Sequence, residues 1–394
     1  MLNRRILRVK AFQSLYAYSQ CKASNFNLAK DFISDAFLPD LNSMEVQDKS
    51  QLKKDAEVCM DLFAKNLNNN KLIAESGHST KIKSTAIKAV NQYHRACEKD
   101  LEFLKNSMLT AVDDIPQLYL SAIQLLIAFG DHVRNEHERK SRLTKDMLLN
   151  TAGELNLAEN KVLQYLKRSP QYEAAVIRNQ AYLHDIEIEI KEWYREYVKP
   201  HEDYQAYLQI EDPTLEEDNA ILQEILKKIV FKTDAILAFF YEKDLNWAEN
   251  KPIVRSLALK VLKNVEETPE PENFTLPEIA INWEEDKEFF QNIFNLSVQS
   301  EEKYKDLIAH KTKNWDIDRL AATDKIIITM ALTEMVNFPS IPTKVSINEY
   351  IDISKTYSTP KSKQFVNGLL DVLAKELTES GEIRKSGRGL LDNK

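Results

Sequence analysis

The sequence predicts an all-α protein, and two observations carry this prediction. Apolar residues recur at helical spacing along most of the 394-residue chain. The chain has only 7 glycines and 12 prolines, which argues against a β-rich fold or a glycine-rich phosphate loop. Hydrophobic residues make up 43% and charged residues 29%, a globular rather than a disordered balance, and the length allows two or three domains.

Cysteine usage and hydropathy exclude several classes of protein. Cys21, Cys59 and Cys97 are odd in number and far apart, so we expect no disulfide framework or zinc ribbon and a cytoplasmic protein. The longest apolar run, residues 118–129, is too short to cross a bilayer, which takes about 20 residues. No phosphate-binding loop, nucleophile elbow or CxxC motif is present. We therefore expect no membrane insertion, no enzymatic activity, no cofactor and no metal.

The N-terminal segment, residues 3–21, predicts one helix. At 100° per residue, Leu7, Ala11, Leu15 and Tyr18 form one stripe that we expect to be buried.

A neighbouring face of this helix carries positive charge. The net charge of the chain is −8, yet residues 1–30 contain no Asp or Glu. Arg5 and Arg8 fall on the same face as Phe12 and Tyr16. Guanidinium groups beside aromatic rings suit single-stranded RNA, although a solvated helix face explains the charge alone as well. Core packing is the favoured role of Phe12, while both roles stay open for Tyr16.

The middle of the chain predicts further helices without a recognisable repeat. Residues 24–50 are polar and contain Pro39, which favours a loop with short helical pieces. Residues 266–277 are rich in proline and acids and predict a linker. We expect helices over 53–67, 82–112, 118–133, 143–168 (one or two), 172–198 (one long helix), 216–231, 232–242, 246–265 and 284–311.

Two helices are predicted near the C-terminus. Pro342 suits a first helical turn, and Ile347, Ile351 and Ile353 lie on or near one face together with Val345. A break at residues 357–360 precedes the second helix. Its predicted buried stripe is Phe365, Leu369, Val372 and Leu373.

Gly368 lies inside this second helix. Glycine costs roughly 1 kcal/mol relative to alanine in a helix interior. Close packing against another helix is the favoured explanation, and presentation of Phe365 to a ligand is the alternative.

Several segments resemble one family. IPTKVSINEYIDISKTYS, followed by KQFVNGLLD, resembles the C-terminal signature of the NusB family of bacterial transcription antitermination factors. The segment from Arg4 to Tyr16 resembles its opening helix, and residues 315–320 and 324–334 look like its middle helices.

The resemblance implies a domain organisation. Residues 1–22 would form the NusB-like N-terminal helix and residues 281–378 the C-terminal helical core. Residues 23–280 would be a large inserted helical bundle that also contains the equivalent of the family's second helix. For residues 379–394, a basic tail, we expect flexibility.

The resemblance also implies a function and a site. We expect a transcription antitermination or termination factor that binds boxA-type RNA together with ribosomal protein S10 in an RNA polymerase complex. Asp324 matches an acidic position near S10, and a charge complementing its helix N-terminus explains it equally well. The residues matched to the family's RNA-binding positions, or lying at the start of the helix that carries one of them, are Arg4, Arg5, Arg8, Tyr16, Lys361, Lys363, Gln364 and Phe365.

Two alternatives stay open at this point. One is a helical protein–protein scaffold with little affinity for RNA. The other is an accessory protein or enzyme of RNA modification, since NusB-like modules also occur joined to RNA methyltransferases. The low glycine content and helical periodicity argue against the α/β domain that such an enzyme requires.

Overall fold

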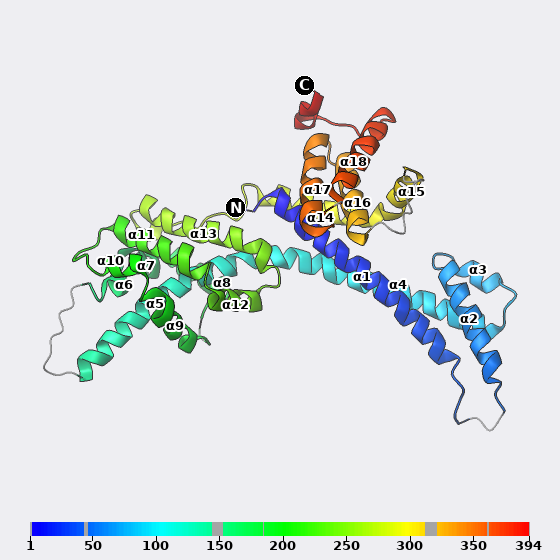
Figure 1. Ribbon diagram of the computed structural model, residues 1–394, viewed down its shortest axis with the longest axis horizontal. Coiled ribbons are helices and arrows are strands. Elements are labelled where there is room, and N and C mark those ends of the chain that lie inside the picture. Colours follow the sequence, from blue (N-terminus) through cyan, green and yellow to red (C-terminus); the bar gives the residue numbers. More distant parts are fainter. Residues whose placement is uncertain are drawn as a thin grey trace. The chain divides into compact units, whose positions relative to one another are not determined.

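The computed structural model describes residues 2–42, 46–143, 153–183, 185–311, 321–360 and 362–393. Within these ranges every regular element is a helix, so the all-α prediction is confirmed. Figure 1 shows the helices in their order along the chain. The chain divides into two compact units. We call residues 1–6 and 109–286 the middle unit, and residues 7–108 and 287–394 the terminal unit.

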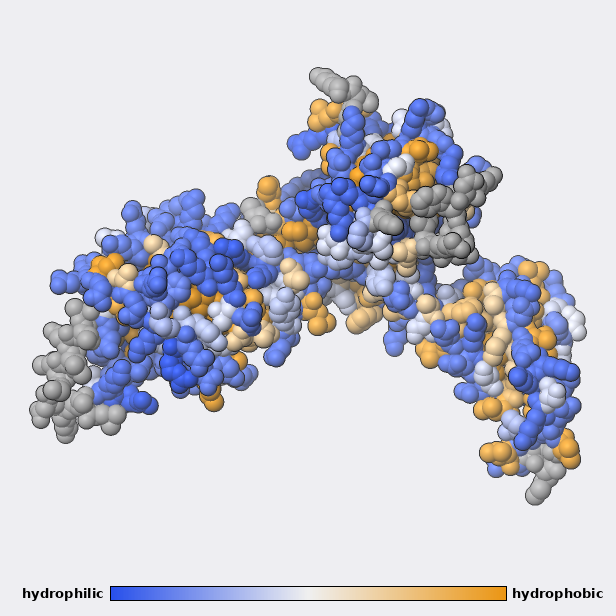
Figure 2. All heavy atoms as spheres, in the orientation of Figure 1, coloured by the Kyte–Doolittle hydropathy of each residue, from blue (hydrophilic) through white to orange (hydrophobic). Residues whose placement is uncertain are grey.

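The middle unit is organised around one long, mostly apolar helix, α5, which packs against α6, α9 and α13. Hydrophilic residues cover most of the face of this unit seen in Figure 2. A 3₁₀ turn, Pro271–Asn273, lies in the predicted linker. The α-helices of this unit are α5 (Ile115–Leu143), α6 (Asn156–Glu159), α7 (Lys161–Arg168), α8 (Pro170–Arg178), α9 (Glu187–Trp193), α10 (Glu202–Tyr207), α11 (Leu215–Glu224), α12 (Asp234–Lys243) and α13 (Trp247–Glu267).

The prediction of one helix over residues 172–198 is wrong. The chain leaves the helix at Gln180, whose φ is 51°, and the amide of Ala181 donates to the carbonyl of Val176. This bond closes a left-handed helix cap that usually requires glycine or asparagine. Because glutamine occupies that position here, the sequence carried no stop signal. After α9 the chain continues as a π-helical turn, Tyr194–Val198.

The terminal unit combines residues 7–108 with residues 287–394. Its central helix, α16, is buried on nearly all sides and packs against α15, α17 and α18. The helices that lie wholly or mostly in this unit are α1 (Arg4–Ala36), α2 (Lys49–Lys65), α3 (Asn70–Glu75), α4 (Thr80–Asp113), α14 (Trp283–Gln299), α15 (Glu301–Lys311), α16 (Ala322–Asn337), α17 (Thr343–Tyr357) and α18 (Ser362–Glu379).

Helix α1 continues to Ala36, so the loop predicted from residue 24 is wrong over its first half. Asn25, Ala29 and Ile33 recur every fourth residue and are buried. Ala29 and Ile33 lie in a second small core formed with α2, α3 and the start of α4, and Asn25 donates to Asp100 of α4. Burial of this stripe keeps the polar segment helical.

The C-terminal tail also differs from expectation. The amide of Ser386 donates to the carbonyl of Pro339 at 3.0 Å, and Lys385 Nζ donates to the carbonyl of Phe338 at 3.1 Å. Ile383 is buried, and a 3₁₀ turn follows over Gly387–Asn393. The tail is therefore attached to the terminal unit through residues 383–386, while Leu390 and Leu391 are exposed.

One stretch of the described chain, Thr80–Arg142, has the length and composition of a membrane-spanning helix. Within the protein, 67% of its most apolar window is buried, as in the core helix of a globular domain.

Candidate nucleic-acid interface

Arg8 lies inside the terminal unit rather than on its surface. Its side chain donates to both carboxylate oxygens of Glu334, through Nε at 2.7 Å and Nη2 at 2.8 Å. The hydroxyls of Ser346 and Tyr350 donate to the same carboxylate at 2.7 and 3.0 Å. This buried network joins α1, α16 and α17, and four donors satisfy the carboxylate.

The electrostatics of this network favour the charged form of Arg8. Burial alone would lower the pKa of Arg8, but the bonds to Glu334 outweigh it and raise that pKa. Burial and the Glu334 carboxylate raise the pKa of Tyr350 well above its ordinary value. The guanidinium of Arg8, only 4% exposed, is therefore directed into the fold, and the expected phosphate contact does not fit this structure. The sequence analysis did not single out Glu334; its only signal was an acidic residue inside an apolar helix.

The other two arginines lie in the first turn of α1. The guanidinium of Arg4 binds Glu285 and Asp286, at 2.5 and 2.9 Å. Burial acts to lower the pKa of Arg4, and these two carboxylates raise it overall. Arg5 is exposed to solvent. Of the three, Arg5 has the position best suited to a phosphate in solution.

The two aromatic residues that share a face with Arg5 and Arg8, Phe12 and Tyr16, differ in burial. Phe12 is 2% exposed, with its ring centroid 5.3 Å from that of Tyr357, so the favoured core role is confirmed. Tyr16 is 39% exposed and lies on the surface of the helix. The predicted stripe that begins at Leu7 and ends at Tyr18 is buried.

The beginning of α18 presents polar side chains to solvent. Lys363 and Gln364 are exposed in its first turn, where backbone amides lack helical partners. Phe365 is half-buried. Lys361 lies outside the described residues.

Asp324 fixes the position of the residues that begin α18. Its carboxylate accepts hydrogen bonds from the hydroxyls of Ser358 at 2.6 Å and Ser362 at 2.7 Å. These bonds attach the turn between α17 and α18 to α16. Because Asp324 is 3% exposed, direct contact with a partner protein does not fit the structure.

Gly368 is exposed, and the prediction that it allows close helix packing is wrong. A Cβ atom added there would meet no heavy atom within 4 Å. Val372, predicted to be buried, is 50% exposed, whereas Leu369 and Leu373 are buried as predicted. Phe365, Gly368 and Val372 follow one another at spacings of three and four residues, so they share a face. We call these three residues the α18 strip.

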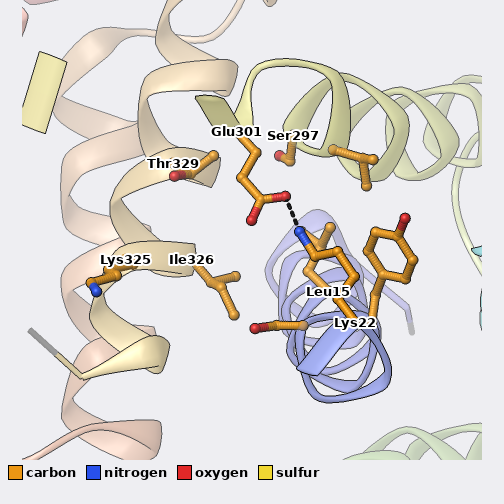
Figure 3. Close-up of a pocket in the computed structure, with 10 residues that line it drawn as sticks. Leu15, Lys22, Ser297, Glu301, Lys325, Ile326 and Thr329 are labelled. Atoms are coloured by element: carbon orange, nitrogen blue, oxygen red, sulfur yellow. Dashed lines mark hydrogen bonds and ion pairs between the residues drawn. The ribbon is translucent and has the colours of Figure 1, made fainter. Parts of the chain in front are cut away.

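A small cavity elsewhere in the terminal unit was a second candidate (Figure 3). It is lined from α1, α14, α15 and α16, and an ion pair joins two of its lining residues, Lys22 and Glu301. The buried hydroxyl of Ser297 lies in its wall without a hydrogen-bond partner in the described structure. Its volume of about 60 Å³ corresponds to roughly two waters, too small for a nucleotide.

Comparison with known proteins identifies related sequences. The model of the NusB family matches residues 252–375, from α13 into α18. The transcription antitermination protein NusB of Salinibacter ruber is 39% identical over 105 residues, 27% of this chain and 66% of the relative. NusB of Koribacter versatilis is 37% identical over 94 residues, 24% of this chain and 64% of the relative.

The chain thus spans slightly less than two thirds of these two relatives. No solved structure shows significant similarity to it. NusB of Chloroherpeton thalassium is 38% identical over 143 residues, which are 35% of this chain and 68% of the relative. With an all-α fold, a matching family model and this extent of similarity, the chain belongs to the NusB family.

Proposed function

We propose that this protein acts in transcription antitermination by binding boxA-type RNA together with ribosomal protein S10 in an RNA polymerase complex. Its relatives are named transcription antitermination proteins, which supports the role. In this proposal the protein binds RNA and protein partners in the cytoplasm and catalyses no reaction. The observation that carries the proposal is the open α18 strip beside the exposed cation of Lys363.

The α18 strip has the properties that a splayed base requires. An aromatic ring offers a stacking surface, and the missing side chain at Gly368 lets a ligand approach the helix backbone closely. Lys363, Gln364 and the first-turn amides of α18 can bind the adjoining phosphate. Arg5 and Tyr16 are the exposed residues of α1 that we assign to the same function.

Arg8 and Asp324 have supporting roles in this proposal. Arg8 holds α1 against α16 and α17 through Glu334. Asp324 fixes the turn from which α18 begins, through Ser358 and Ser362. Both residues act on the RNA surface through the helices that they position.

A gel-shift titration of boxA RNA, with and without S10, tests the proposal. We expect wild-type protein with S10 to bind, and Phe365→Ala to weaken binding by about 1–3 kcal/mol, or roughly 5- to 150-fold. Phe12→Ala is the matched control, because it removes the same side chain from the core. It should lower stability by about 3–5 kcal/mol and leave the affinity of the folded fraction unchanged.

Two results would contradict the proposal in different ways. Wild-type protein that binds S10 but ignores boxA RNA would favour a protein–protein scaffold. If Phe365→Ala lowers stability by several kcal/mol without changing the affinity of folded protein, Phe365 belongs to the core and not to the RNA surface.

A further inference from the structure

The middle unit contains a cavity whose charge is opposite to that of the whole chain. The cavity measures about 370 Å³ and lies between α5 and the segment Lys191–Lys199. Among its lining residues the only acid is Glu136. Four cationic side chains line it: Arg139, Lys191, Arg195 and Lys199.

The π-helical turn explains how three of these cations come to face one cavity. In a regular α-helix, positions four residues apart drift by about 40° around the axis, so Lys199 would lie about 80° away from Lys191. Here the amide of Lys199 bonds to the carbonyl of Tyr194, five residues back. In this wider turn four residues fall short of a full circle, so the drift reverses. Lys191, Arg195 and Lys199 therefore all line the same cavity.

The one acid in the cavity does not cancel this charge. Glu136 is paired with Lys140 at 3.1 Å, outside the lining. Burial alone would raise the pKa of Glu136, but Lys140, Lys199 and His132 lower it. Burial lowers the pKa of His132; Glu136 opposes this shift, and the nearby cations Lys191 and Lys199 add to it. Arg195 is itself paired with Glu196 at 3.1 Å, and the positive field of the cavity comes mainly from Arg139, Lys191 and Lys199.

A second cavity, of about 400 Å³, adjoins the first and shares His132, Asn135 and Lys191 with it. Its two acids are Asp131, which is paired with Lys167, and Glu187. Apolar and aromatic side chains supply much of the remaining wall: Ile127, Tyr182, Leu183 and Ile190. The two cavities form one groove, which we call the α5 groove, with a basic half and a more apolar half.

We propose that the α5 groove binds single-stranded RNA, with successive phosphates along the basic half and an unstacked base in the apolar half. The line Lys191, Arg195, Lys199 advances about 6 Å per step, which suits a repeating polyanion better than one phosphate group. The tyrosine and aliphatic wall suits the flat apolar faces of a base. This inference goes beyond the proposed function, because it gives the inserted unit an RNA contact separate from α18.

Fluorescence anisotropy with a labelled oligouridine that lacks any boxA sequence tests the α5 groove in the full chain. The triple variant Lys191→Ala, Arg195→Ala, Lys199→Ala should weaken binding at least tenfold. Its salt dependence should become shallower by about 0.7 for each lost phosphate contact. The matched control removes three exposed cations from α13, as Arg255→Ala, Lys260→Ala and Lys263→Ala, and should leave binding within twofold.

A gain-of-function variant separates binding from folding. Glu136→Gln removes the acid of the basic half, so it should tighten oligouridine binding, a result that misfolding cannot produce. Phe365→Ala should lower boxA affinity far more than oligouridine affinity, and the triple variant should do the reverse, which distinguishes failure of this site from failure of the α18 site. Wild-type oligouridine affinity in the triple variant would overturn the inference. Full displacement of the RNA by a phosphopeptide at equal concentration would overturn it also, in favour of a protein ligand.

Discussion

Replacing Gly368 with alanine should stabilise the protein. The position lies inside α18, is exposed, and leaves an added Cβ with no heavy atom within 4 Å. The substitution therefore gains helix propensity without a steric cost, about 1 kcal/mol. From the sequence alone a larger side chain is expected to clash there, so the sign of the effect separates the two views.

Hydrogen exchange measured by mass spectrometry on peptides from α18 reports this change locally. Exchange of protected amides should slow about fivefold, the factor that corresponds to 1 kcal/mol. Gly130→Ala in α5 is the matched control. An added Cβ there would lie 3.0 Å from the carbonyl oxygen of Leu157 and 3.1 Å from Leu163 Cδ1, so this variant should lose stability.

A titration of the Gly368→Ala variant with boxA RNA tests why glycine occurs at this position. If a base approaches the backbone at Gly368, the stabilised variant should bind boxA RNA several-fold more weakly. Faster exchange in α18 would refute the open surface. Unchanged RNA affinity, with slower exchange, would remove Gly368 from the proposed site.

Two further predictions concern buried groups. Arg8→Ala should destabilise the protein by about 3–5 kcal/mol in denaturant titrations, because it leaves Glu334 buried without its counter-charge, whereas exposed Arg5→Ala should stay within about 0.5 kcal/mol. Similar small losses for both would contradict the buried network. Burial raises the pKa of the Cys59 thiol to about 11, so alkylation of native protein at pH 8 should label the partly exposed Cys21 first, as read by mass spectrometry. Early labelling of Cys59 would show that the core around α2 opens readily.

Sequence periodicity was sufficient to predict which residues are buried where burial depends only on the face of the helix. The stripe that contains Leu7, Ala11 and Leu15 could be read from spacing, because one face of an amphipathic helix meets the core whatever its partner is. The burial of Arg8 could not be predicted from spacing. Its burial depends on Glu334, 326 positions away, which no local pattern connects to it.

The same limit explains the error at Gly368. Helix propensity marks the residue as costly but cannot say what lies opposite it, which only the packing of α16, α17 and α18 decides. Asp324 is similar: its position in a first helical turn was correctly recognised, while its bonds to Ser358 and Ser362 required the tertiary structure.

The distance along the chain between Arg8 and Glu334 has a consequence for synthesis on the ribosome. At about 5–20 residues per second, the 326 intervening positions take roughly 15–65 s to translate. During this interval the nascent α1 has neither its carboxylate partner nor the helices that cover its apolar stripe. The helices of the middle unit leave the ribosome before α16 and α17, and they pack against one another. Completion of the terminal unit therefore waits until α16 and α17 have left the ribosome, and the first half of α1 is the segment that a chaperone would meet exposed the longest.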